Sequence, residues 1–233
     1  MINLNIPEFK GFSKETLNFL RQNHTHNSRP WFDQHKDSYR QHVLLPFQSL
    51  VCDLAKTMLD IDPWFEIRPA VDKTISRIYR DTRFSKDKTL YRDNIWLTFK
   101  RPSATQDWTA APAFFFEIFP TWYRYGMGYY NAPAITMQKF RSVIDADPKK
   151  FLKVISFYQR EKFYKLQGER YKRQKQSAYP PEISEWYECK SFYLTCNKKV
   201  DRVLLSAQLL KELRIRFSVL KPLYLFLIHL HEI

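Results

Sequence analysis

The sequence predicts an α+β protein with a mostly antiparallel sheet of four to five strands packed against helices. Helical periodicity occupies the N-terminal quarter and returns after residue 134, whereas four short apolar runs fall between residues 74 and 130. Strands at such short spacing, without intervening helices, favour an antiparallel meander over βαβ units. The 233 residues are 44% hydrophobic and 27% charged, as is typical of a globular protein and not of a disordered one. We therefore expect a single domain over residues 1–233.

The N-terminal helices are predicted over residues 13–60. Ser13 is a suitable N-cap, and the Arg29-Pro30 step is a suitable start for a second helix, because proline is favoured in a first helical turn. We expect Pro46 to interrupt the pattern. The apolar stripe of a further helix follows it, formed by Phe47, Leu50, Val51, Leu54 and Met58.

The sheet is predicted over residues 74–130, with a polar loop at 103–107. Its expected strands are Thr74–Tyr79, Ile95–Phe99, Phe114–Phe119 and Trp122–Tyr130.

Helices are predicted again over residues 134–165. Within them, Asp147-Pro148 is an N-cap followed by a first-turn proline. A fifth strand is predicted at 190–196, and C-terminal helices at 200–230, where Leu209, Leu213 and Phe217 share one face.

Several protein classes are excluded or disfavoured by composition. The chain has only four glycines and neither a GxxxxGK[ST] nor a GxGxxG motif, which excludes P-loop and dinucleotide-binding folds. Three cysteines without a CxxC pair make a disulfide framework improbable, and the histidines lack partners at metal-ligand spacing. We expect no metal and no cofactor.

The sequence has neither a signal-peptide pattern nor a 20-residue apolar run. We therefore expect a cytoplasmic protein that does not contact a membrane.

Positive charge is concentrated in two stretches. The formal net charge is +14, with +6 from Lys73 to Arg101 and +8 from Lys149 to Lys175, and the remainder balances. Clustered lysines and arginines attract phosphates or acidic surfaces. An ordinary basic surface is the alternative.

The most distinctive segment is RIYRDTRFSKDKTLY, from Arg77 to Tyr91. Arginines at the end of a strand can hold a phosphate or carboxylate in bidentate fashion. This pattern predicts a site for an anionic small molecule or a phosphate group, with ligand-binding residues Arg77, Arg80, Arg83, Lys88 and Arg29. The alternative is that the arginines pair with Asp81, Asp87, Glu66 or Asp72 and brace a loop.

The same segment has the spacing RxxRDxRFxxx[DN]KxxY, which resembles the signature of a bacterial family known as domain of unknown function 2461. The resemblance extends along the chain, through Gly11-Phe12-Ser13, Asn27 to Phe32 with Lys36 and Tyr39, and the Gly126-Met127-Gly128 turn. Pro30 stands where an acidic residue is more usual in the family. The resemblance implies that these polar residues serve a function, but the family has no established activity. We therefore favour a binding site over a braced loop.

An enzyme acting on a phosphorylated or carboxylated substrate at this loop is a second hypothesis. Asp81, Lys88 and Tyr91 would be its catalytic residues. Flanking cations are expected to lower the pKa of Asp81, which suits a charge-stabilising or general-base role and disfavours a role as general acid. Lys88 would act as a base or nucleophile, and Tyr91 would donate a proton.

Weak, non-specific nucleic-acid binding is a third hypothesis. Aromatic and basic residues alternate between Phe157 and Lys165, as in single-strand binding surfaces. An amphipathic helix with a solvated basic face would give the same pattern.

Overall fold

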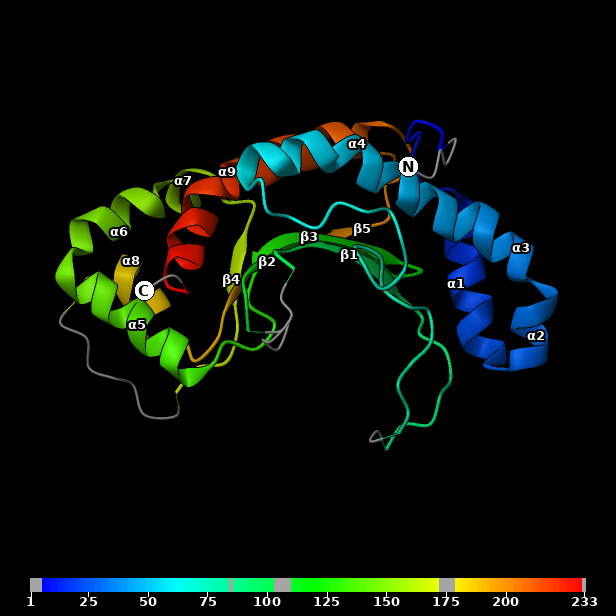
Figure 1. Ribbon diagram of the computed structural model, residues 1–233, viewed down its shortest axis with the longest axis horizontal. Helices are drawn as coiled ribbons and strands as arrows, with labels where there is room; N and C mark the ends of the chain where they lie inside the picture. Colours follow the sequence, from blue (N-terminus) through cyan, green and yellow to red (C-terminus); the bar gives the residue numbers. More distant parts are fainter. Residues whose placement is uncertain (1–5, 84–85, 103–109, 172–178, 232–233) are drawn as a thin grey trace. The chain divides into compact units, whose positions relative to one another are not determined.

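The computed structural model describes residues 6–83, 86–102, 110–171 and 179–231 (Figure 1). The chain divides into two compact units. Unit 1 comprises residues 1–99, 115–125 and 197–215, and unit 2 comprises residues 100–114, 126–196 and 216–233. The α+β class is confirmed, since helices accompany a five-stranded antiparallel sheet.

The sheet has the strand order β1-β2-β3-β5-β4. Its strands are β1 (Ile95–Phe99), β2 (Ala113–Ile118), β3 (Trp122–Gly128), β4 (Lys165–Gln167) and β5 (Tyr193–Lys199). The predicted second, third, fourth and fifth strands thus correspond to β1, β2, β3 and β5. Sequence analysis missed β4, because three residues are too few to show the alternation of apolar and polar side chains.

The predicted strand at Thr74–Tyr79 is wrong. This segment forms isolated bridges, Ile75 with Leu97 and Tyr79 with Tyr91. Thr98 donates its N–H to the Thr74 carbonyl at 2.8 Å, whereas Arg92 donates to Ile78 at 3.0 Å. The segment changes partner between these two contacts, so no continuous ladder forms despite its β-rich composition.

The helices of unit 1 begin with α1 (Lys14–His26), whose predicted N-cap is confirmed. Ser13 Oγ accepts a hydrogen bond from the Thr16 N–H, and Thr16 Oγ1 accepts one from the Ser13 N–H. The helices α2 (Arg29–Gln34) and α3 (Lys36–Tyr39) follow, then the π-helical turn η1 (Arg40–Leu44) and α4 (Leu45–Ile61). Helix α1 contacts α2, α3 and η1.

The expectation that Pro46 interrupts the helical pattern is wrong, because the π-helical turn η1 accommodates this proline and leads directly into α4. Proline has no N–H and its ring displaces the carbonyl four residues earlier, which is that of His42. That carbonyl instead accepts a 2.5 Å hydrogen bond from Thr16 Oγ1 on α1. The helical path therefore continues into α4, whose apolar face is buried.

The helices of unit 2 are α5 (Ala134–Ala146), α6 (Pro148–Val154), α7 (Ser156–Arg160) and α8 (Pro181–Tyr187). The predicted Asp147 cap is confirmed, since Asp147 Oδ1 accepts from the Lys150 N–H at 2.9 Å. The predicted helical region 134–165 ends earlier, at Arg160. In place of several C-terminal helices over 200–230, the structure has one helix, α9 (Gln208–His229), preceded by turns.

Aromatic side chains dominate the core of each unit. In unit 1, Phe12 stacks on Phe116 with ring centroids 5.6 Å apart. In unit 2, Trp186 is fully buried and its ring lies 5.4 Å from Phe192 and 6.0 Å from Phe151. Much of the 17% aromatic content of the sequence is thus structural.

Within unit 2, the close approach of β3 to β5 requires glycine at position 128. Gly128 has φ +154°, and a Cβ there would lie 2.6 Å from Tyr193 Cβ and closer still to the Tyr193 Cα.

We expect Gly128→Ala to lower the free energy of unfolding by about 3 kcal/mol, because the added methyl group overlaps Tyr193 and alanine is strained at this φ. Urea unfolding measures this change. Ser142→Ala, at an exposed position of α5, is the control and should change stability by less than about 0.5 kcal/mol.

Candidate functional site

The distinctive loop is attached to the first helices through Asn27. Asn27 terminates α1 in the left-handed conformation, with φ 44° and ψ 43°. Its side-chain oxygen accepts the N–H groups of Leu90 at 2.7 Å and Tyr91 at 3.2 Å. Two segments 63 residues apart, both of which carry the family resemblance, therefore meet at one side chain.

Aromatic packing reinforces this junction. Phe32 on α2 stacks on Tyr91 with a centroid distance of 5.1 Å, and it contacts Tyr79 edge-on at 5.4 Å. Tyr91 is only 1% exposed. Burial raises its pKa to about 12, Tyr79 adds to the shift, and the charge of Arg29 opposes it. Tyr91 is thus a protonated phenol at neutral pH, and Arg29 lies in its vicinity.

The three arginines of the loop each pair with a different carboxylate. The ion pairs are Arg77 with Asp72 at 2.5 Å, Arg80 with Asp87 at 2.8 Å, and Arg83 with Asp81 at 2.8 Å. Glu66, the other expected partner, pairs with Arg68. The internal pairing considered from the sequence is therefore present.

The residues considered for catalysis are each held by a different partner. Asp81 receives two hydrogen bonds from the Arg83 guanidinium, at 3.0 and 2.8 Å. Lys88 Nζ donates to the Thr82 carbonyl at 2.9 Å, and the Tyr91 ring packs on Phe32. Phe84, the aromatic residue of the signature, lies outside the described residues.

The pKa values of the loop carboxylates Asp81 and Asp87 are both lowered. Hydrogen bonds from Arg83 hold the pKa of Asp81 at about 2, and those from Thr89 lower the pKa of Asp87. The lowered pKa of Asp81 is in the direction expected from the sequence. Both side chains are ionised at neutral pH and are unsuited to act as general acids.

A pocket of about 550 Å³ lies beside the loop, within unit 1. Helices α2 and α3, the turn η1 and the segment 71–79 contribute its walls. It is lined by Phe32, Lys36, Tyr39, Arg40, Leu44, Val71, Asp72, Arg77, Ile78 and Tyr79. Of the residues predicted to bind a ligand, only Arg77 is in this lining. Sequence analysis missed Arg40 and Tyr79, although the family resemblance pointed to Lys36 and Tyr39.

The charge of this pocket is positive. Lys36, Arg40 and Arg77 contribute three cations, against the single carboxylate of Asp72. The Arg77–Asp72 pair is exposed on both sides, with 65% and 52% of the side-chain surfaces accessible. Arg40 has its own exposed partner, Asp37, at 3.1 Å.

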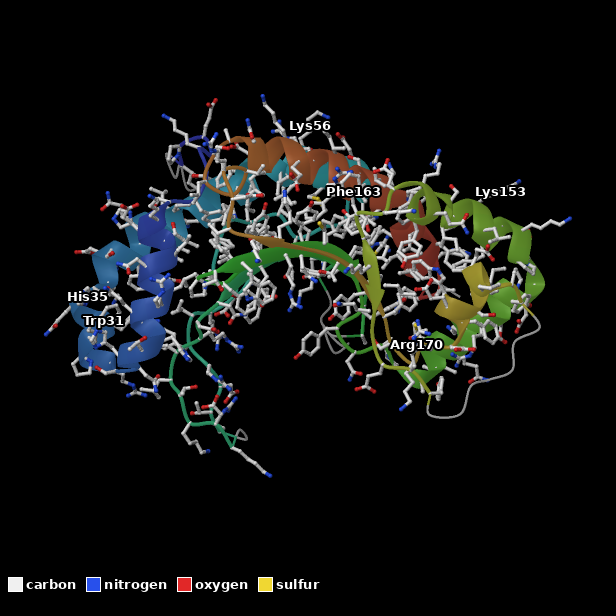
Figure 2. The ribbon with its side chains drawn as sticks, turned by 180° about the vertical axis from the view of Figure 1, so that it is seen from behind. Trp31, His35, Lys56, Lys153, Phe163 and Arg170 are labelled. Carbon is white, nitrogen blue, oxygen red and sulfur yellow. The ribbon has the colours of Figure 1, made fainter. Side chains whose placement is uncertain are left out.

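The aromatic–basic stretch from Phe157 to Lys165 is not a continuous helix. Helix α7 ends at Arg160, and both Phe157 and Tyr164 are buried. Phe163, labelled in Figure 2, is half-exposed, and the Arg216 guanidinium covers its ring at 3.4 Å. This arrangement leaves few aromatic faces for stacking bases. The residues 172–175 of the basic stretch lie outside the described part of the chain, as does the predicted polar loop at 103–107.

Two further properties follow from the residues that the structure describes. Among them, no group of three or more His, Cys, Asp or Glu side chains is placed to hold a metal ion. Nor does any of the described helices have the length and apolar character needed to cross a membrane.

The fold and the junction define an α+β protein in which an arginine-rich loop is joined to an N-terminal helical layer. The family model described as conserved hypothetical protein (DUF2461) matches residues 15–226. The chain belongs to this family, as the resemblance predicted. A search of curated proteins found no match.

The first prediction for this site concerns Asn27. Asn27→Gly retains the left-handed backbone but removes the acceptor of two amide N–H groups, so we expect the free energy of unfolding to fall by about 1–2 kcal/mol. Asn27→Ala should cost about 1 kcal/mol more, because alanine resists positive φ. Urea unfolding of both variants measures the two contributions separately. Equal stability of Asn27→Gly and the wild type would show that the junction does not depend on these hydrogen bonds.

The second prediction concerns the pH dependence of the Asp81–Arg83 pair. The folded pKa, about 2, lies below the ordinary value of about 3.9. The pair therefore contributes stability above about pH 4, and this contribution is lost as the pH falls through 2. Carbon-13 NMR of the Asp81 carboxyl group should show a midpoint near 2 that rises toward 3.9 in Arg83→Gln. Arg68→Gln, which removes the partner of Glu66, is the control and should leave this midpoint unchanged.

Proposed function

We propose that the protein binds a small anionic ligand, a phosphate or carboxylate carried on an apolar or aromatic body, in the pocket beside the loop. The observation that carries this proposal is the convergence of Lys36, Arg40 and Arg77 on one pocket. Cations that converge around an aromatic wall provide both attraction for an anion and a surface for the body attached to it.

The ion pair of Arg77 is compatible with ligand binding. An exposed pair between arginine and a carboxylate contributes only about 0–1 kcal/mol, because both groups remain partly hydrated. A phosphate or carboxylate can therefore replace Asp72 as the partner of Arg77 at little cost. The hydrogen bond from Arg77 Nε to Asp72 Oδ1 orients the guanidinium at the pocket.

The walls of the pocket suit a ligand with an apolar or aromatic part. Phe32 and Tyr39 are buried beneath the pocket, and Tyr79 is 46% exposed. Burial raises the pKa of Tyr39 to about 12, so its hydroxyl remains protonated and can donate a hydrogen bond to an anion.

The geometry favours binding over catalysis. Within the described residues, the lining includes one carboxylate, Asp72, and that carboxylate is engaged by Arg77. Asp81 and Lys88 belong to the outer part of the loop and are held by their own partners. The arginines Arg80 and Arg83 brace that outer part in this proposal, and Arg77 binds the ligand.

The test is calorimetric titration of the whole protein with phenyl phosphate and with inorganic phosphate. We expect phenyl phosphate to bind more tightly, by about tenfold, because its ring is buried against the aromatic wall. Arg77→Met should weaken binding of both ligands by tenfold or more, since a charge-assisted contact is lost. Tyr79→Ala should reduce the preference for phenyl phosphate.

Arg68→Met is the matched control for Arg77→Met. Arg68 is similarly exposed, at 63%, and also pairs with a nearby carboxylate, Glu66, but it does not line the pocket. Its removal should leave both affinities unchanged. Equal losses in the two variants would mean that general surface charge attracts the anion, and the proposed site would be abandoned.

A further inference from the structure

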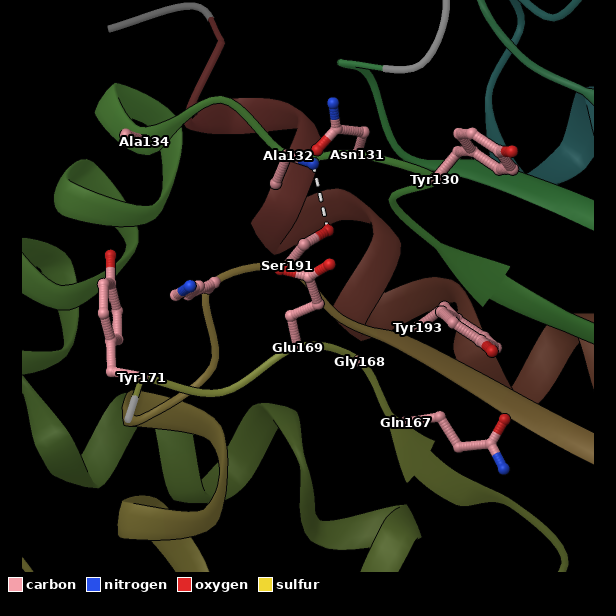
Figure 3. A pocket seen from close by; sticks show the side chains of 11 residues that line it. Tyr130, Asn131, Ala132, Ala134, Gln167, Gly168, Glu169, Tyr171, Ser191 and Tyr193 are labelled. Carbon is pink, nitrogen blue, oxygen red and sulfur yellow. Dashed lines mark hydrogen bonds between the residues drawn. The ribbon is translucent and has the colours of Figure 1, made fainter. Parts of the chain in front are cut away.

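Unit 2 contains a second and larger pocket, of about 870 Å³, which shares no lining residue with the anion pocket (Figure 3). Three chain segments form it: residues 130–134 after β3, residues 167–171 after β4, and residues 190–193 at the start of β5. It is lined by Tyr130, Asn131, Ala132, Ala134, Gln167, Gly168, Glu169, Tyr171, Lys190, Ser191 and Tyr193.

Backbone contacts hold the walls of this pocket in place. The Lys190 N–H donates to the Glu169 carbonyl at 2.7 Å, and the Ala132 N–H donates to Ser191 Oγ at 3.0 Å. Gln167 and Tyr193 are directly opposite in the β4–β5 ladder, which places their side chains on the same face of the sheet. The three segments of the site are therefore held to one another by hydrogen bonds and strand pairing.

Gly168 permits the closest approach between two of these segments. It has φ +148°, and a Cβ at this position would lie 2.8 Å from Phe192 Cα and overlap the Ser191 carbonyl oxygen. The backbone at the base of the pocket thus requires a residue without a side chain, in a protein with only four glycines.

The polar groups of the lining are balanced in charge and varied in hydrogen bonding. The ammonium of Lys190 is offset by the carboxylate of Glu169. The amides of Asn131 and Gln167 can both donate and accept, and the Ser191 hydroxyl retains its own proton when it accepts from Ala132. Such a set matches a ligand with several hydroxyl groups and no net charge better than it matches a phosphate.

Two tyrosine rings provide an apolar surface beside these polar groups. Figure 3 shows Tyr130 and Tyr193 on the same side of the pocket, and Tyr130 is 79% exposed. A third tyrosine of the lining, Tyr171, has the Arg141 guanidinium and the Lys190 ammonium over its ring at 5.5 and 5.6 Å. An aromatic face next to amide and carboxylate groups suits a sugar ring, which has an apolar C–H face and a rim of hydroxyls.

We propose that this pocket binds a neutral saccharide, with Tyr130 and Tyr193 stacking against the sugar and Asn131, Gln167 and Glu169 bonding its hydroxyls. The volume lies within the range of small-molecule sites and suits a ligand of two or three sugar units. A nucleoside would also stack on tyrosine and hydrogen-bond to amide side chains, so nucleosides are included in the test as the competing ligand class.

The experiment is saturation-transfer NMR and titration of the whole protein with a panel of neutral trisaccharides: maltotriose, cellotriose, xylotriose and triacetylchitotriose. We expect at least one to bind. Tyr193→Ala should weaken that binding about tenfold or more, whereas Tyr193→Phe, which keeps the ring, should change it by less than about threefold. Gln167→Ala should also weaken binding, and Gln138→Ala, at an exposed site on α5, should not.

Two controls keep the outcome decisive. Trp64→Ala removes another exposed aromatic ring, 70% exposed and in unit 1, and should leave saccharide binding unchanged. Inorganic phosphate should not compete with the saccharide, which separates this site from the anion pocket. Absence of binding across the panel, insensitivity to Tyr193→Ala, or preferential binding of uridine or adenosine at the same residues would overturn the proposal. Thermal unfolding of each variant confirms that the comparison is made between folded proteins.

Discussion

The candidate anion site depends on one interaction, the pair of hydrogen bonds from the N–H groups of Leu90 and Tyr91 to the Asn27 side chain. Asn27 can serve in this way because it ends α1 in the left-handed conformation, which turns the chain toward α2. The anchored residues pair in turn with the segment 77–80, since Arg80 donates its N–H to the Leu90 carbonyl. A single amide thus brings Phe32 and Tyr79 into contact and creates one wall of the pocket.

Another part of the pocket lining depends on how the helical path passes Pro46. The π-helical turn η1 directly follows α3, so Tyr39 and Arg40 lie where the helical geometry changes. The His42 carbonyl, which Pro46 cannot bond, is satisfied by Thr16 Oγ1 on α1. π-Helical turns are frequent at functional sites, where they change the direction of side chains. In this protein the turn contributes Arg40 and Leu44 to the lining of the pocket.

The arginines of the loop lie in two kinds of environment that the sequence alone does not distinguish. Toward its tip, Arg80 and Arg83 neutralise Asp87 and Asp81, and such pairs order an exposed loop without contributing much stability. At its base, Arg77 has a partner of the same kind but also lines a pocket with two further cations.

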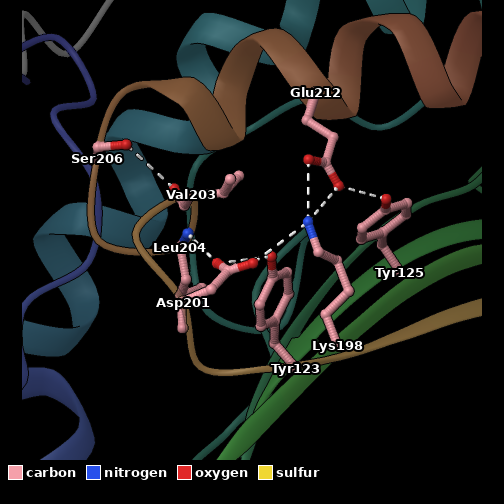
Figure 4. Close-up of polar contacts among 8 residues, drawn as sticks. All are labelled: Tyr123, Tyr125, Lys198, Asp201, Val203, Leu204, Ser206 and Glu212. Atoms are coloured by element: carbon pink, nitrogen blue, oxygen red, sulfur yellow. Dashed lines mark hydrogen bonds and ion pairs between the residues drawn. The ribbon is translucent and has the colours of Figure 1, made fainter.

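Figure 4 shows a contrasting case in unit 1, where Lys198 donates hydrogen bonds to Glu212 and forms an ion pair with Asp201, beside two buried tyrosines, Tyr123 and Tyr125. In that cluster the lysine forms an ion pair with each of the two carboxylates.

The sequence by itself determined what depends on nearby residues. The caps at Ser13 and Asp147, the four longer strands, the α+β class and the family all follow from signals a few residues long, or from the signature. The tertiary structure alone decided the partners of the loop arginines, the absence of a ladder at 74–79 and the meeting of Lys36 and Arg40 with Arg77. Hydrogen-bond periodicity acts over three or four residues and is visible in the sequence. Side-chain pairing within a loop depends on the backbone conformation of that loop, and contacts between separate segments depend on strand register and helix packing, which only the folded chain establishes.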